Sequence, residues 1–244
     1  MSRETVESPA ESRTGFGKTD RKDNWWVGPL LTALGLGAFV VYSTFRAIYN
    51  KDYVVEWEGW GEMLSPFYSP LLVLPFLPSW ISPAFLILWA PGGFRVTCYY
   101  YRKAYYRAFF ADPAACAVGE ARGHKYKGET FVLLFQNLHR YFLYFALAFL
   151  VILSIDTIRT MIGPDGFQIT VGTLVLAMNT TLLSMYTFSC HSLRHLIGGK
   201  IDCFSCVAFG KSRHKMWKGV SRLNENHMLW AWLSLFGVGF TDFY

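Results

Sequence analysis

A chain of 244 residues is long enough for one or two soluble domains, but its composition argues for a membrane protein. Hydrophobic residues make up 52% of the sequence and charged residues only 16%, below the roughly 25% that globular domains carry. The charges are unevenly spread and leave apolar runs of about 20 residues, the length of a helix that crosses a bilayer. Disorder, a secreted disulfide scaffold and a nucleic-acid-binding protein are disfavoured, and basic loops explain the net charge of +6.

The polar tail, residues 1–24, is expected to be cytoplasmic and flexible when unbound, and no cleavable signal peptide is predicted. The membrane domain covers 25–244. Its apolar runs predict an all-α bundle of five transmembrane helices, at about 26–49, 81–100, 131–155, 169–197 and 228–244. The second span is expected to be interrupted at Pro91-Gly92-Gly93, and part of the proline-rich stretch 70–91 is expected to lie in the interface or re-enter.

Loop charges predict the orientation of this bundle. The loops 101–130 and 199–223 each carry six Lys or Arg residues, whereas the loops 50–80 and 156–167 carry one each. Because basic loops stay in the cytoplasm, the chain is predicted to be N-in and C-out. An outer aromatic belt would then include Trp57, Trp60 and Trp80.

All histidines and cysteines fall on the predicted inner half of this topology. They are His124, His139, His191, His195, His214 and His227, with Cys98, Cys116, Cys190, Cys203 and Cys206. Because the cytoplasmic side is reducing, exported disulfides are not indicated. Metal or redox chemistry at the cytoplasmic leaflet is the better interpretation.

One segment concentrates these residues within a short stretch of chain. His191 and His195 are spaced i, i+4 and share a helix face, and Cys203 and Cys206 form a CxxC pair that can offer two thiolates to one site. Spacing alone leaves three interpretations open: a structural zinc site, a Rieske-type [2Fe–2S] centre, or a helix end followed by an incidental CxxC. Cys190 is interpreted as a packed thiol because it points away from His191 on a helix.

A second polar group, Gln136, His139 and Arg140, lies in the inner half of the third span. Ionisable residues within a membrane are costly and usually functional, although Arg140 can also reach headgroups. His139 suits a quinone carbonyl, or it pairs with His227 as the axial ligands of a b-type haem; ordinary packing explains both histidines equally well. Arg95 is a further buried cation that needs a partner or an anionic ligand.

Three segments together resemble one known family: 91–107 (PGGFRVTCYYYRKAYYR), 135–141 (FQNLHRY), and 190–206 with its CHSLRH and CFSC motifs. They are similar to the single membrane-anchor subunit of the actinobacterial type of succinate dehydrogenase, respiratory complex II. The likeness runs from the first span to the C-terminus and leaves out the polar tail. It favours a docking surface, beyond simple membrane anchoring, for the tyrosines and cations of 98–107.

The resemblance implies that the chain holds the flavoprotein and iron–sulfur subunits at the cytoplasmic face of a bacterial plasma membrane. Succinate oxidation would occur on the partner flavin, and electrons would pass through the partner's iron–sulfur chain and this subunit to quinone. This type of anchor departs from better-known ones by lacking haem and carrying a membrane-embedded Rieske-type [2Fe–2S] cluster. By motif position, His191 and His195 would bind one iron, and Cys203 and Cys206 the other.

The motif does not define the quinone contacts. The residues expected to contact quinone are His139 and Arg140, followed by Tyr99, Gln136 and Trp217. Two alternatives remain open. One is a haem b anchor of the same complex, with His139 and His227 as axial ligands, and the other is a zinc-stabilised membrane scaffold or transporter without electron transfer.

Overall fold

A computed structural model describes residues 15–57, 61–76, 78, 81–120, 129–163 and 166–244. The side chains of Trp57 and of residues 129–136 are outside that description. The helices in chain order are α1 (Val27–Tyr49), α2 (Pro83–Ile87), α3 (Trp89–Thr97), α4 (Tyr99–Phe109), α5 (Glu129–Arg159), α6 (Val171–Phe188), α7 (His191–Arg194), α8 (Gly210–Asn224) and α9 (His227–Phe243). A π-helical turn, His195–Gly199, follows α7, and a 3-10 turn, Phe204–Cys206, precedes α8.

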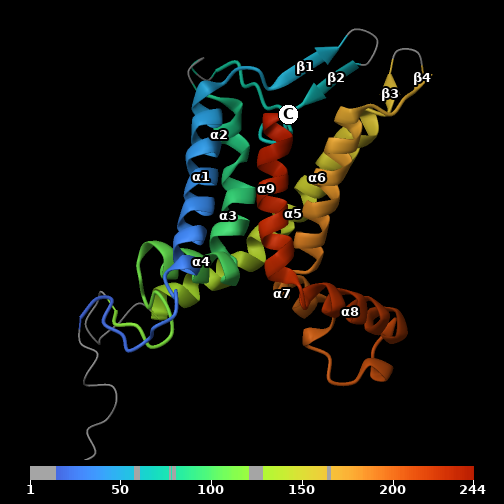
Figure 1. Ribbon diagram of the computed structural model, residues 1–244. Helices are drawn as coiled ribbons and strands as arrows, with labels where there is room; N and C mark the ends of the chain where they lie inside the picture. Colours follow the sequence, from blue (N-terminus) through green and yellow to red (C-terminus); the bar gives the residue numbers. More distant parts are fainter. Residues whose placement is uncertain (1–14, 58–60, 77, 79–80, 121–128, 164–165) are drawn as a thin grey trace, which may run out of the picture.

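The long helices stand together in one bundle (Figure 1). Helix α6 packs on α5 and α9, α5 packs on α3, and α1 packs on α4 and α9. Two antiparallel hairpins, β1 (Val54–Trp57) with β2 (Gly61–Leu64) and β3 (Ile162–Gly163) with β4 (Gly166–Phe167), lie at one end of the bundle. We call this the hairpin end, and the opposite end, which carries α4, α7 and α8, the α8 end. The sequence predicted neither hairpin.

Three of the described helices are long and apolar enough to cross a membrane: Val27–Tyr49, Asn137–Arg159 and Val171–Phe188. They overlap the first, third and fourth predicted spans, but the fourth was predicted to continue to residue 197, whereas α6 ends at Phe188 because Cys190 is extended. The fifth predicted span forms the 17-residue α9, which is about 26 Å long and so somewhat short of a roughly 30 Å hydrocarbon core. Five spans and the N-in orientation therefore stay predictions. So does the outer aromatic belt, because Trp60 and Trp80 lie outside the described residues.

The second predicted span is interrupted at a different place from the one expected. Pro91 lies in the first turn of α3 and has no N–H to donate to Ile87, and the chain departs from regular helix at Leu88, between α2 and α3. It then stays helical as far as Thr97 and turns at Cys98, whose backbone is extended (φ −64°, ψ 135°). The glycines at 92–93 therefore do not break the helix.

The described part of the polar tail is tied to the loop before α5. The N–H of Gly17 donates to the carbonyl of Gly119 (3.0 Å), and that of Gly119 donates to the carbonyl of Lys18 (2.8 Å). The Arg21 guanidinium donates to the carbonyl of Cys116 (2.9 Å). Residues 17–21 are thus hydrogen-bonded to one of the two basic loops, and the flexibility of the tail stays a prediction.

The main core lies toward the α8 end, between α3, α5, α6 and α9. Its buried members include Phe94, Leu143, Tyr186 and Leu235, together with the two thiols of Cys98 and Cys190. A smaller core at the hairpin end packs α1 and α9 against the loop that contains Phe67 and Tyr68. Two of the five cysteines are therefore core residues.

Candidate metal centre

The four ligands predicted from the sequence are not gathered around one space. Cys203 and Cys206 are bonded to each other as a disulfide. His191 and His195 have exposed side chains, on α7 and on the π-helical turn that follows it. In the part of the chain that the structure describes, no group of three or more His, Cys, Asp or Glu residues is placed to hold a metal ion. The same absence holds for every other group of described residues, so this ligand set stays a prediction.

A different set of two histidines and two cysteines converges at the α8 end of the bundle. Cys98, His139, Cys190 and His227 come from four separate places in the chain and are buried, with exposed fractions of 1%, 7%, 0% and 1%. The Nε2 atom of His139 lies 3.2 Å from the Sγ atom of Cys190, and that of His227 lies 3.7 Å from the Sγ atom of Cys98. We call these four residues the His–Cys centre.

The two cysteines of the centre occupy equivalent backbone positions. Cys98 joins α3 to α4 with φ −64° and ψ 135°, and Cys190 joins α6 to α7 with φ −64° and ψ 136°. One extended residue between two helices redirects the chain, so each thiol sits at a helix junction. The Cys190 thiol also accepts the N–H of Ser192 (3.3 Å) and thereby caps α7. Both sulfur atoms are thus positioned by backbone structure.

The residue before each cysteine holds the histidine that faces the other cysteine. Thr97 precedes Cys98, and its Oγ1 lies 2.9 Å from Nδ1 of His139. Ser189 precedes Cys190, and its Oγ lies 2.6 Å from Nδ1 of His227. These bonds link the two cysteine junctions crosswise, so the four residues form one connected unit.

The hydroxyl groups also determine which ring nitrogen carries the proton. The Thr97 hydroxyl donates to the carbonyl of Gly93 (2.7 Å), and the Ser189 hydroxyl donates to the carbonyl of Tyr186 (3.0 Å). With its single hydrogen already donated, each oxygen accepts from the Nδ1–H of its histidine. Both Nε2 atoms therefore present a lone pair toward a sulfur atom. Metal-ligating histidines typically have their other ring N–H bonded in this way.

Each of the two imidazoles of the centre stacks against an aromatic ring. The ring of Phe94 stacks on His139 with centroids 4.5 Å apart, and the ring of Tyr186 stacks on His227 at 5.2 Å. A cavity of 380 Å³ opens beside the centre. It is lined by Thr97, Cys98, Tyr99, Tyr100, His139, His191, Ser192 and His227. The centre is thus packed on its aromatic side and accessible on its cavity side.

The donor set fits a two-iron cluster better than the other groups considered. Two imidazoles and two thiolates are the ligands of a Rieske-type [2Fe–2S] centre, in which each iron takes only two protein ligands. A haem held axially by His139 and His227 fits less well, because a thiol lies at each Nε2 atom. Zinc accepts the same ligand types but needs all four around one point, and the described residues show no such group.

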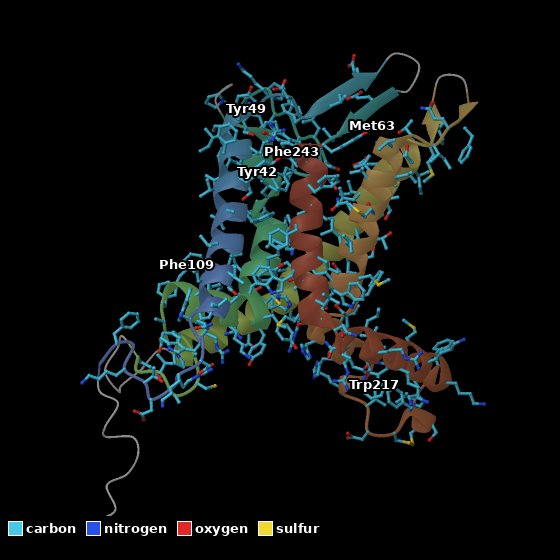
Figure 2. All side chains as sticks on the ribbon, in the orientation of Figure 1. Tyr42, Tyr49, Met63, Phe109, Trp217 and Phe243 are labelled. Carbon is cyan, nitrogen blue, oxygen red and sulfur yellow. A yellow bond between two sulfur atoms is a disulfide. The ribbon has the colours of Figure 1, made fainter. Side chains whose placement is uncertain are left out.

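The predicted quinone contacts are only partly brought together. His139 and Tyr99 line the cavity beside the centre. Arg140 is exposed on α5, and the side chain of Gln136 lies outside the described residues. Trp217 lies on α8 and is not among the residues that line this cavity (Figure 2).

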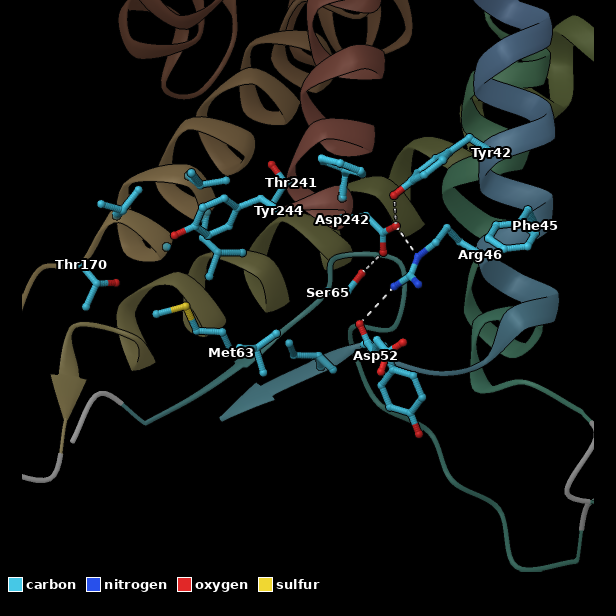
Figure 3. A pocket seen from close by; sticks show the side chains of 18 of the residues that line it. Tyr42, Phe45, Arg46, Asp52, Met63, Ser65, Thr170, Thr241, Asp242 and Tyr244 are labelled. Carbon is cyan, nitrogen blue, oxygen red and sulfur yellow. Dashed lines mark hydrogen bonds and ion pairs between the residues drawn. The ribbon is translucent and has the colours of Figure 1, made fainter. Parts of the chain in front are cut away.

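A larger cavity, of 830 Å³, lies at the hairpin end beside the last turn of α9 (Figure 3). Its central polar group is Asp242, whose carboxylate accepts from the Tyr42 hydroxyl (2.6 Å), from Nε of Arg46 (2.8 Å) and from the Ser65 hydroxyl. The Asp242 side chain is 0% exposed and that of Arg46 is 12% exposed. This ion pair joins α1 and α9, its carboxylate also binds the loop after β2, and it was not predicted from the sequence.

Sequence reasoning placed the centre's four residues on the same side of the membrane but grouped them differently. It paired His139 with His227 for haem and interpreted Cys190 as a packed thiol. A usable signal was present in the repeated pattern of a hydroxyl residue followed by cysteine near a helix end, Thr97-Cys98 and Ser189-Cys190. Which histidine faces which cysteine depends on the packing of four helices.

An apolar helical bundle in which three helices are long enough to cross a membrane indicates an integral membrane protein, and this one buries two histidines and two cysteines at one end. Residues 27–244 match the model of the family described as actinobacterial succinate dehydrogenase subunit SdhC, and the chain belongs to this family. It is 40% identical to a chain of the Mycobacterium smegmatis Sdh1 complex in the apo form, with a TM-score of 0.84, and the match covers 100% of this chain and 92% of that one. No curated protein matches the chain.

The protein is therefore a membrane-anchor subunit of succinate dehydrogenase, and other subunits of that complex are its partners. The predictions of a membrane location, of an anchoring role and of these partners are confirmed at this level. The cofactor, its ligands and the quinone contacts stay open and are proposed below.

Proposed function

We propose that this anchor passes electrons from the iron–sulfur subunit to quinone through a Rieske-type [2Fe–2S] cluster held by the His–Cys centre. The proposal keeps the cluster implied by the family resemblance and changes its ligands. Its main support is the convergence, in one buried space, of two thiols and two Nε2 atoms whose imidazoles are each held at Nδ1 by a hydroxyl group.

When bound, the cluster would supply one-electron transfer between the partner and quinone. The imidazoles of His139 and His227 would hold one iron, and the thiolates of Cys98 and Cys190 the other. Thr97 and Ser189 keep each imidazole in the tautomer that can ligate. The stacked aromatic rings keep water from one side of the centre.

The cavity beside the centre is the best-supported place for the quinone headgroup. Its 380 Å³ falls within the range of small-molecule sites, and Tyr99, Tyr100 and His191 are among its lining residues. Quinone reduction consumes two electrons and two protons. The exposed imidazole of His191 can relay a proton from water to a quinone oxygen, and Tyr99 can hydrogen-bond the other end of the ring.

The soluble subunits would dock on the α8 end. Exposed cations gather there on α4 and α8, namely Lys103, Lys211, Lys215, Lys218 and Arg222. They suit an acidic partner surface and the phosphate groups of surrounding lipids. Docking at this end would bring the partner's iron–sulfur chain to the end of the bundle that holds the His–Cys centre.

The ligand assignment is tested on the purified complex with one double variant of the centre and two matched control double variants. In His139→Ala/His227→Ala we expect the anchor's EPR signal, its iron and sulfide beyond the partner's share, and succinate:quinone activity to be lost. Succinate oxidation with a soluble dye should persist, which shows that the soluble subunits remain intact. In His191→Ala/His195→Ala, and in Cys203→Ser/Cys206→Ser, the EPR signal should remain.

Other outcomes separate the alternatives. A signal lost in the control variants and kept in His139→Ala/His227→Ala would return the ligands to the set predicted from the sequence. One zinc per chain, with no EPR signal from the anchor, would favour a zinc-stabilised scaffold. A Soret band that disappears in His139→Ala/His227→Ala would favour haem b.

A further inference from the structure

Arg95 is a cation inside the bundle with only neutral partners among the described residues. Its guanidinium donates to the Tyr101 hydroxyl (2.5 Å), to the Ser234 hydroxyl (3.1 Å) and to the carbonyl of Ala231 (3.3 Å). All three partner residues are buried, with exposed fractions of 4%, 0% and 1%. The ion pairs found among the described residues do not involve Arg95. Its positive charge is hydrogen-bonded but not neutralised.

This charge lies close to the His–Cys centre. The guanidinium carbon is 4.9 Å from the ring centroid of Tyr186, and the same ring stacks on His227 with centroids 5.2 Å apart and planes within 10°. Arg95 also lies one helical turn before Cys98, whose N–H donates to its carbonyl (3.1 Å). The Tyr186 ring thus contacts the Arg95 guanidinium and also stacks on the His227 imidazole of the centre.

The Tyr186 hydroxyl is the second unusual group at this place. It is buried, and apart from a weak contact with the Cys98 thiol it has no hydrogen-bond partner among the described residues. Its charged and polar neighbours include the Cys98 thiol, Tyr101 and Arg95. A thiolate at Cys98 would be a better acceptor than a thiol, because hydrogen bonds to an ionised acceptor are stronger. The hydroxyl is therefore placed to donate to that sulfur when it binds iron.

We propose that Arg95 and Tyr186 are positioning residues that raise the electron affinity of the His–Cys centre. The inference rests on the proposed function, because it assigns a role toward the cluster. Adding one electron makes the centre more negative. A nearby cation without an anionic partner favours that added charge, and a hydrogen bond to a ligand sulfur acts in the same direction. Neither residue binds iron.

The size of the effect follows from the geometry. The two stacking distances put the guanidinium no more than about 10 Å from the His227 ring, where at an effective dielectric constant of about 20 one charge changes a one-electron equilibrium about tenfold. A tenfold change corresponds to a fall of about 59 mV in the midpoint potential of a one-electron couple.

The test is an EPR-monitored redox titration of the anchor's cluster in the purified complex. Arg95→Gln should lower the midpoint potential, by an amount that corresponds to an about tenfold smaller equilibrium constant for reduction. Arg95→Lys keeps the charge and should leave the midpoint potential near the wild-type value. Tyr186→Phe should lower the midpoint potential. If Arg95→Gln does not assemble, Ser234→Asp places a carboxylate beside the retained guanidinium and should produce the same fall. Ser234→Asn is its uncharged control of similar shape.

Two failures are distinguishable. A wild-type complex without an EPR signal from the anchor would refute the proposed function, and the question of its potential would not arise. A wild-type signal with an unchanged midpoint potential in Arg95→Gln, or in Ser234→Asp relative to Ser234→Asn, would overturn the role of Arg95 while leaving the cluster in place. An unchanged midpoint in Tyr186→Phe would overturn the role of the hydroxyl.

Discussion

Replacing Asp242 by alanine is expected to destabilise the hairpin end strongly, because it strands the buried cation of Arg46. The Asp242 side chain is 0% exposed and that of Arg46 12% exposed, with Nε and Oδ2 2.8 Å apart. Removing one member of a buried ion pair costs about 3–5 kcal/mol. Arg46 keeps hydrogen bonds to the carbonyls of Lys51 and Asp52 (3.3 and 3.2 Å). We therefore expect a loss near the lower end of that range, about 3 kcal/mol.

The assay is the midpoint temperature at which the anchor leaves the purified complex on heating, where a loss of this size corresponds to a fall on the order of 10 °C. Asp242→Asn is the matched control that keeps the shape and removes the charge. The double variant Arg46→Met/Asp242→Leu removes both charges, and its loss should be much smaller because no unpaired ion remains. A midpoint temperature equal to that of the wild type in Asp242→Ala would refute the cost assigned to an unpaired Arg46. A fall in the double variant as large as that in Asp242→Ala would refute it as well.

Two further predictions concern the centre and the helix packing that forms it. Thr97→Val removes the oxygen that accepts from Nδ1 of His139 and should weaken metal retention about 10–100-fold. The iron content of the purified complex measures this retention, and Thr97→Ser is the control. Full iron content in Thr97→Val would mean that this hydroxyl does not orient a ligand. Gly93→Ala would place a Cβ 2.2 Å from the ring of Phe142 and should cost about 1–3 kcal/mol. The thermal assay should show no such loss in Gly92→Ala, where nothing lies within 4 Å, and equal midpoints for the two variants would contradict the close approach of α3 and α5.

Several features were predictable because they depend on short stretches of sequence. The apolar runs at 26–49, 131–155 and 169–197 were recognised by length and composition, and the structure has long apolar helices there. The interruption of the second span was predicted at Pro91 but lies at Leu88, because a proline affects the helix through the carbonyl four residues earlier. The hairpins were missed because their strands have only four or two residues each, too few for an alternating pattern to be recognised.

The candidate site shows the limit of spacing as evidence. The i, i+4 pair His191 and His195 and the CxxC pair Cys203 and Cys206 were grouped because residues close in sequence can share one ligand. The contacts that form the centre join residues 51 and 129 positions apart, His139 with Cys190 and Cys98 with His227. Spacing patterns relate only residues that are close in sequence, so they cannot predict contacts between residues this far apart.

By itself, the sequence determined the class of protein and indicated that the histidines and cysteines share one end of the bundle, because hydropathy and loop charge are properties of single segments. Tertiary structure alone decided which thiols meet which imidazoles, which hydroxyl groups hold them, and that Arg95 has neutral partners. Those contacts arise where separate helices pack together, and the energy of helix packing depends on side chains that are far apart in the chain.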